Sequence, residues 1–105
     1  MGGAMMETAV VMELFKSILH RGVEPELWFW RTSTGEEVDI LVKTEGSLIP
    51  FEVKLNATPH PKMASGIRGF RNALGPSTSP GYLVHPGDRR FPLGQGVTAL
   101  PFSEL

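Results

Sequence analysis

Three side chains on two neighbouring predicted strands have the types and spacing needed for metal-assisted chemistry on phosphate. Asp39 lies in the segment 36–43, and Glu52 and Lys54 lie in the segment 48–55. A hairpin that turns symmetrically about Glu45 and Gly46 pairs residues whose numbers sum to 91, so Asp39 faces Glu52. Since side chains alternate along a strand, Lys54 shares their face.

The facing carboxylates predict a cation between them. Their Cβ atoms would lie about 5 Å apart, a distance at which like charges destabilise a sheet. A divalent cation between the carboxylates would remove that cost, and a site made only of oxygen ligands suits Mg²⁺ or Mn²⁺. Lys54 could then orient or deprotonate a metal-bound water, or stabilise a pentacovalent phosphate.

A fourth acidic residue, Glu7, lies where an apolar side chain is expected. The segment 5–21 has helical periodicity, and an apolar stripe runs along one face of it. Glu7 sits in the middle of this stripe, whereas Glu13 falls on the opposite face. We therefore expect Glu7 to point inward, where it could bind the metal directly or through water. The stripe consists of Val10, Val11, Leu14 and Ile18.

The alternative interpretation needs no site. Asp39 and Glu52 could occupy the solvent face of an amphipathic hairpin. Glu37 would then face Lys54 in a surface salt bridge worth under about 1 kcal/mol. The other face of the hairpin is apolar and would pack on the core; its residues are Val38, Ile40, Val42, Ile49, Phe51 and Val53.

The remaining segments supply the frame that must position these residues. An aromatic strand is expected at 26–32, and a helix is expected at 61–74 with Pro61 at its first position. Further strands are expected at 82–85 and 97–102. The order α-β-β-β-α-β-β predicts an α/β fold with a central mixed sheet flanked by helices. At 105 residues, we expect the span 1–105 to form a single domain.

Composition excludes several classes of protein. The chain has no cysteine, which excludes disulfide scaffolds, thiol nucleophiles and Cys-containing zinc sites. It has no apolar run long enough to span a membrane, and its first residues lack the basic segment and apolar core of a signal peptide, so we expect no cleaved leader. We therefore expect a cytoplasmic protein without a membrane partner. The net charge of −1 divides unevenly, because residues 1–55 carry five basic and nine acidic groups and residues 56–105 carry five basic and two acidic.

These motifs resemble a known superfamily. Asp39 followed by Glu52-Val53-Lys54 on the next strand, after a helix with Glu7, is similar to the PD-(D/E)XK nucleases, whose core is αβββαβ. The resemblance is closer to the nuclease-like C-terminal domain of prokaryotic AAA-type ATPases, a domain of unknown function. The segments that support it are Gly3-x-x-x-Glu7, Trp28-Phe29-Trp30-Arg31-Thr32, Glu37-Val38-Asp39 and Ile49-Pro50-Phe51-Glu52-Val53-Lys54.

The resemblance implies roles for particular residues. The metal ligands would be Asp39 and Glu52, the main-chain carbonyl of Val53 would be a third, and Glu7 would be the helix glutamate. Lys54 would be the catalytic lysine, and the reaction would be Mg²⁺-dependent hydrolysis of phosphodiester bonds. The G-x-x-x-x-G-K-[ST] loop of ATPases is absent from the sequence, so this chain by itself is not expected to be an ATPase.

Three functions stay open at this point. The first is a nuclease-like domain acting on DNA or RNA, with phosphate contacts from Arg31, Arg68, Arg71, Arg89 and Arg90. The second is a non-catalytic interaction or regulatory module that docks on an ATPase partner or forms a homodimer. The third is a nucleic-acid-binding module that does not cleave. Each arginine could also be an ordinary solvated side chain.

Overall fold

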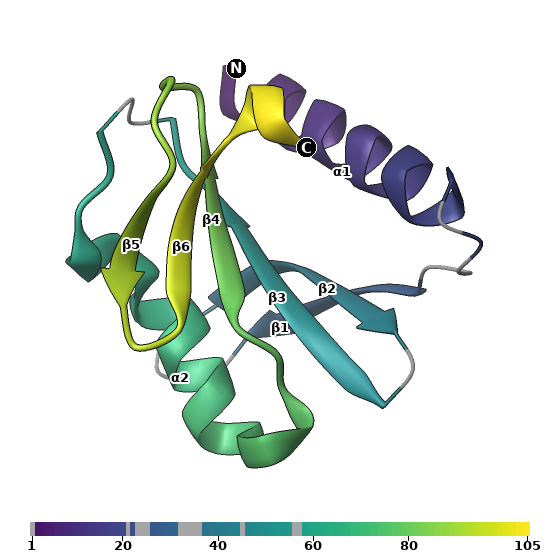
Figure 1. Ribbon diagram of the computed structural model, residues 1–105, viewed down its shortest axis with the longest axis vertical. Coiled ribbons are helices and arrows are strands. Elements are labelled where there is room, and N and C mark those ends of the chain that lie inside the picture. Colours follow the sequence, from purple (N-terminus) through teal and green to yellow (C-terminus); the bar gives the residue numbers. More distant parts are fainter. Residues whose placement is uncertain (1, 21, 23–25, 32–36, 45, 56–57) are drawn as a thin grey trace.

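A computed structural model of the chain describes residues 2–20, 22, 26–31, 37–44, 46–55 and 58–105. Within these ranges the side chains of 2–7, 18, 26–31, 37, 39 and 44 lie outside the description. Figure 1 shows the arrangement of the elements. In chain order they are α1 (Gly2–His20), β1 (Glu26–Arg31), β2 (Glu37–Thr44), β3 (Ser47–Val53), η1 (Pro61–Ala64), α2 (Ser65–Leu74), η2 (Gly75–Ser77), β4 (Gly81–His85), β5 (Phe91–Gly94), β6 (Val97–Pro101) and η3 (Phe102–Glu104).

The described strands form one mixed sheet with the order β1-β2-β3-β4-β6-β5. The first three strands pair antiparallel, β3, β4 and β6 pair parallel, and β5 pairs antiparallel with β6. The expected α/β fold with a mixed central sheet is therefore confirmed. Since β3 and β4 are parallel, both strands end at the same end of the sheet.

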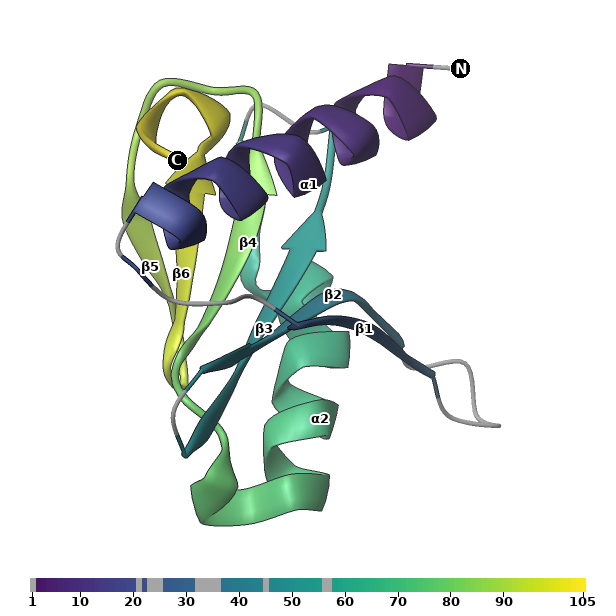
Figure 2. The same ribbon diagram turned by 90° about the vertical axis from the view of Figure 1, so that its right-hand side faces the viewer.

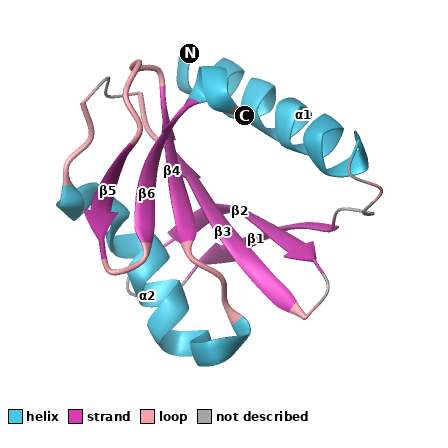
Figure 3. Cartoon of the chain, in the orientation of Figure 1, coloured by secondary structure: helices cyan, strands magenta, loops and turns pink. Residues whose placement is uncertain are grey.

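The two long helices cover opposite faces of this sheet, as Figures 2 and 3 show. On one face, Val10 and Leu14 of α1 pack against Ile40, Val42 and Phe51. On the other face, Ile67 and Phe70 of α2 are fully buried against a second cluster that includes Leu41 and Leu83. Because both faces are covered, an inward-facing polar residue on a central strand lies inside the protein rather than in solvent.

The hairpin between β2 and β3 has the register expected from the sequence. The pairs run from Thr44 with Ser47 to Ile40 with Phe51, and Gly46 takes a positive φ of 72° in the tight turn. The partner strand β1, however, shifts register between Trp28 and Trp30. This bulge gives β2 one extra residue between Leu41 and Val38. Val38 consequently packs in the cluster that α2 covers. The alternation had predicted that Val38 would share a face with Ile40, and that prediction is wrong.

Strand β5 was not expected from the sequence. It is short and contains Pro92, which cannot donate a hydrogen bond to a neighbouring strand. Since β5 is the edge strand of the sheet, that lost donor costs little there. The predicted strand at 97–102 is confirmed as β6 but ends at Pro101.

Candidate active site

Glu52 and Lys54 form an ion pair where β3 ends. Glu52 pairs in register with Leu83 of β4, and the main-chain N–H of Lys54 donates to the carbonyl oxygen of Val84 at 2.9 Å. This parallel pairing fixes the backbone on which both side chains stand. The Nζ atom of Lys54 lies 3.5 Å from Oε1 of Glu52.

The two members of the pair differ sharply in exposure. The Glu52 side chain is 6% exposed and that of Lys54 is 39% exposed, and Oε2 of Glu52 is fully enclosed. Removing a carboxylate from water costs several kcal/mol unless nearby charges and hydrogen bonds compensate. Glu52 therefore does not belong to a solvent face, and that alternative interpretation is wrong for this residue.

The other two predicted acidic ligands are placed only through their backbones. Asp39 is in β2, immediately before Ile40, whose partner Phe51 immediately precedes Glu52. Glu7 is in the second turn of α1. In both views the N-terminal end of α1 lies at the end of the sheet where β3 finishes (Figures 1 and 2). The side chains of Asp39 and Glu7 lie outside the described residues.

The donors at this end of the sheet fit a hard divalent cation in kind. Glu52, Asp39, Glu7 and the Val53 carbonyl offer only oxygen atoms, the donors that Mg²⁺ and Mn²⁺ prefer. Within the described part of the chain, no three His, Cys, Asp or Glu side chains come together as a metal site. Glu52 is the one carboxylate of the predicted set whose side chain is described.

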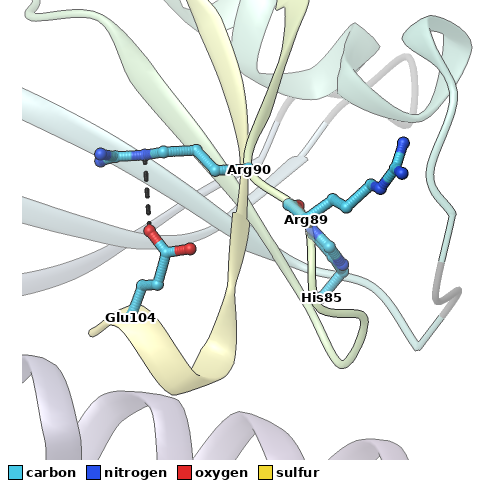
Figure 4. A network of polar contacts seen from close by, with 4 residues as sticks. All are labelled: His85, Arg89, Arg90 and Glu104. Carbon is cyan, nitrogen blue, oxygen red and sulfur yellow. Dashed lines mark hydrogen bonds and ion pairs between the residues drawn. The ribbon is translucent and has the colours of Figure 1, made fainter.

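Two of the five candidate arginines lie at the same end of the sheet. Arg89 and Arg90 are in the connection from β4 to β5, and both are exposed. Arg90 pairs with Glu104, with 3.8 Å between Nε and Oε1 (Figure 4). Arg89 is exposed, and its described hydrogen bond is made by its main-chain carbonyl, which accepts from His85.

His85 holds this connection in place. It is fully buried, its Nε2 lies 3.0 Å from the carbonyl oxygen of Arg89, and its Nδ1 accepts the N–H of Gly87 at 3.1 Å. Because a carbonyl can only accept, Nε2 is the ring nitrogen that donates to Arg89. His85 thus has a structural role, and exposed His20 and His60 lie elsewhere.

Arg68 and Arg71 do not join this group. Both are on α2, beside the β5–β6 hairpin turn, so Arg71 and Arg90 are associated with opposite ends of β5. In Figures 1 and 2 the hairpin turn lies at the end of the sheet opposite to the β4–β5 connection. The five candidate arginines therefore do not form one phosphate-binding surface. The side chain of Arg31 lies outside the described residues.

The sequence did not point to the residues that surround Arg68 and Arg71. The described lining of a pocket of about 330 Å³ consists of these two arginines with Asn72 and Gln95. Gln95 reaches this place only because β5 and β6 form a hairpin. The available signal was Gly94-Gln95-Gly96, a turn sequence between two apolar segments.

Comparison with known proteins gives a family. The family described as "Domain of unknown function (DUF4143)" matches residues 2–105. Two mycobacterial proteins are each 35% identical to this chain over 80 residues: the uncharacterized protein Mb2031c of Mycobacterium bovis and the uncharacterized protein Rv2008c of Mycobacterium tuberculosis. The match covers 75% of this chain but 17% of each relative. No solved structure matches significantly.

None of the helices in the described ranges has both the length and the apolar character required to cross a bilayer.

Proposed function

The chain belongs to the DUF4143 family, and we propose that it is a metal-dependent nuclease domain that hydrolyses phosphodiester bonds of nucleic acid. The observation that supports this best is the burial of Glu52 beside Lys54, where two parallel strands end. A carboxylate held out of water next to a half-exposed ammonium is a common arrangement at catalytic sites. The matched segment covers 17% of each relative. Any nuclease activity of a longer protein that contains this domain is therefore part of the same proposal.

The residues have distinct roles under this proposal. Glu52, Asp39, Glu7 and the Val53 carbonyl would hold Mg²⁺ or Mn²⁺. When bound, the cation would supply a polarised water and would stabilise charge on the phosphate. Lys54 sits at the boundary between the buried carboxylate and solvent, where its ammonium can contact the scissile phosphate. Arg89, exposed at the same end of the sheet, can bind a neighbouring phosphate of the substrate strand.

A plasmid-nicking assay tests the proposal. Wild-type protein with Mn²⁺ or Mg²⁺ is expected to convert supercoiled plasmid to nicked circles, and EDTA should stop the reaction. Lys54→Ala and Asp39→Ala should each lower the rate at least about 100-fold, the scale on which catalytic groups act. The control is Lys62→Ala, because Lys62 is an exposed lysine on η1.

Equal nicking by wild type and Lys54→Ala would identify a contaminating nuclease and overturn the proposal. The absence of cleavage with both metals on single-stranded and double-stranded DNA and RNA would also overturn it.

A second function, a docking module, is favoured by a stripe of exposed apolar residues on α1. Met12, Phe15 and Leu19 recur at helical spacing and are 55%, 39% and 51% exposed. Beside the stripe, Glu13 and Lys16 pair at 3.8 Å, so its flank carries one charge of each sign. Under a two-fold axis, Glu13 of one copy can face Lys16 of the other, so this flank is complementary to itself. We infer that the stripe, if it docks, packs against a second copy of the chain.

Light scattering after size exclusion distinguishes the occupants. The docking module predicts a dimer that Met12→Glu with Leu19→Glu converts to a monomer, whereas Leu74→Glu, an exposed apolar position on α2, leaves it dimeric. A wild-type monomer at tens of micromolar would contradict the second copy and leave an ATPase domain, which the sequence resemblance implies, as the alternative occupant.

A further inference from the structure

Positive charge gathers on α2 beside the β5–β6 turn, at the end of the sheet opposite to the Glu52 site. The sequence contains no Asp or Glu between residues 55 and 87, although Lys62, Arg68 and Arg71 fall within that span. Arg68 and Arg71 lie one turn apart on α2, at a spacing where like charges repel. Neither takes part in a salt bridge within the described ranges. Their charge is therefore not neutralised by a described carboxylate.

Both guanidinium groups are nevertheless held in place by the backbone. Nη2 of Arg68 donates to the carbonyl oxygen of Pro61 at 2.6 Å, and Nη1 of Arg71 donates to the carbonyl oxygen of Gln95 at 2.6 Å. Each of these bonds uses one of the donors that a guanidinium presents. The remaining donors are thus fixed in direction, and no other hydrogen bond to a described residue engages them.

The hairpin turn between β5 and β6 makes room for Arg71. Gln95 and Gly96 have φ angles of 53° and 79°, the positive values required at both central positions of a type I′ turn. A Cβ added to Gly96 would overlap Nη1 of Arg71. A side chain at residue 96 would therefore displace the guanidinium of Arg71 from this position. Its Nε is buried and has no acceptor among the described atoms.

The resulting pocket has the chemistry of an oxyanion site. Its volume is about 330 Å³, and its described lining adds the side chains of Asn72 and Gln95 to the two arginines. Fixed guanidinium forks match the oxygen geometry of phosphate, and the amides supply further donors. No acidic side chain is among the described lining residues.

We propose that this pocket binds a phosphate group through Arg68 and Arg71. The site is independent of the nuclease proposal, because Glu52 and Lys54 are absent from its described lining. The phosphate can belong to a small molecule or to a nucleic acid, and both present the same oxygens to the arginines.

Titration of the 105-residue chain in EDTA tests the proposal without any cleavage. Inorganic phosphate, added at constant ionic strength against chloride, is expected to raise the unfolding temperature and to shift the backbone NMR signals of residues 68–72 and 94–96. Arg68→Gln should weaken phosphate binding at least tenfold, and Arg68→Gln with Arg71→Gln should abolish it. Lys16→Gln is the control, because Lys16 is an exposed cation on α1, which covers the opposite face of the sheet.

Two further arms keep the result interpretable. Arg68→Gln is the decisive variant, because its described side-chain contact is a single bond to Pro61 and its folding can be verified from the unfolding temperature. The NMR signals that phosphate shifts should be those of residues 68–72 and 94–96 and not those of residues 52–54, which separates this site from the cleavage site. A 5′-phosphorylated oligonucleotide that binds more tightly than inorganic phosphate would identify nucleic acid as the source; the reverse order would identify a small molecule.

Phosphate affinity unchanged in Arg68→Gln, or a wild-type response equal for phosphate and chloride, would overturn the proposal.

Discussion

At the scale of single residues, the pair of Glu52 and Lys54 has an energetic cost that a purely structural role does not explain. Free carboxyl and amino side chains are both charged near neutral pH, and Glu52 is almost wholly enclosed. Replacing a buried ion pair by neutral groups is often neutral or stabilising, whereas removing one partner of a structural pair is costly. The response of the free energy of unfolding to neutralisation of Glu52 therefore separates a structural role from a functional one.

Glu52→Gln keeps the shape of the side chain and removes its charge. Because the half-exposed Lys54 can be solvated by water once its partner is neutral, we expect the free energy of unfolding to change by less than about 1 kcal/mol. Urea denaturation monitored by circular dichroism measures it, and the nicking assay should lose activity in the same variant. A loss above about 3 kcal/mol would show that the ion pair serves stability, and Glu13→Gln in the exposed pair with Lys16 provides the reference.

At the scale of elements, the two tight hairpins of the sheet use glycine for different reasons. Gly46 in the β2–β3 turn has a φ of 72°, and a Cβ added there would meet nothing within 4 Å, whereas at Gly96 the Cβ would overlap Arg71. The first position requires glycine for its backbone conformation alone. The second has the same backbone requirement, with a φ of 79°, and a Cβ there would in addition displace the guanidinium of Arg71.

Alanine at these two positions measures the difference. Gly46→Ala is expected to cost about 1–2 kcal/mol of stability, which is the penalty of the left-handed conformation. Gly96→Ala should cost at least as much and should also displace Arg71, weakening phosphate binding tenfold or more. Thermal unfolding and the phosphate titration provide the two readouts. Equal phosphate affinity in both variants would show that Arg71 does not depend on the open turn.

The parts of the sheet that could be predicted are those set by residues close together in the sequence. The β2–β3 register followed from the turn at Glu45 and Gly46 and from the alternation of apolar residues, both local features. The position of Val38 did not follow, because the bulge in β2 arises from its pairing with β1. Strand β5 was missed because Pro92 argues against a strand, and only its place at the sheet edge permits it.

The candidate site was predictable to a similar extent. The burial of Glu52 could not be derived from the hairpin alone, since an isolated hairpin leaves one face to water. Its register partner Leu83 belongs to the cluster that Ile67 and Phe70 of α2 cover, so burial follows from α2 packing on that face. The pocket at Arg68 and Arg71 depends on a contact between α2 and a turn 24 residues further along the chain, which no local pattern encodes.

At the scale of the whole molecule, the net charge of −1 conceals two separate basic regions. Arg89 and Arg90 lie at the end of the sheet where β3 and β4 finish, and Arg68 and Arg71 lie beside the β5–β6 turn at the other end. Nucleic acid bound for cleavage would contact the first region, because it lies at the same end as Glu52 and Lys54. The positive charge of this region is partly neutralised, because Glu104 in η3 pairs with Arg90.

Neutralising Glu104 is therefore expected to strengthen the binding of nucleic acid. In Glu104→Gln, Arg90 loses its carboxylate partner and can contact a phosphate, so the affinity for a single-stranded oligonucleotide should rise about two- to fivefold at low salt. The slope of log Kobs against log salt concentration should become steeper by up to about 0.7, the value for one additional phosphate contact on a single strand. Fluorescence anisotropy in EDTA measures both quantities.

Arg90→Gln should shift both in the opposite direction, and combining it with Glu104→Gln should remove the gain, because the effect passes through Arg90. A gain that persists in the double variant would show that Glu104 acts through the general field of the molecule rather than through this ion pair.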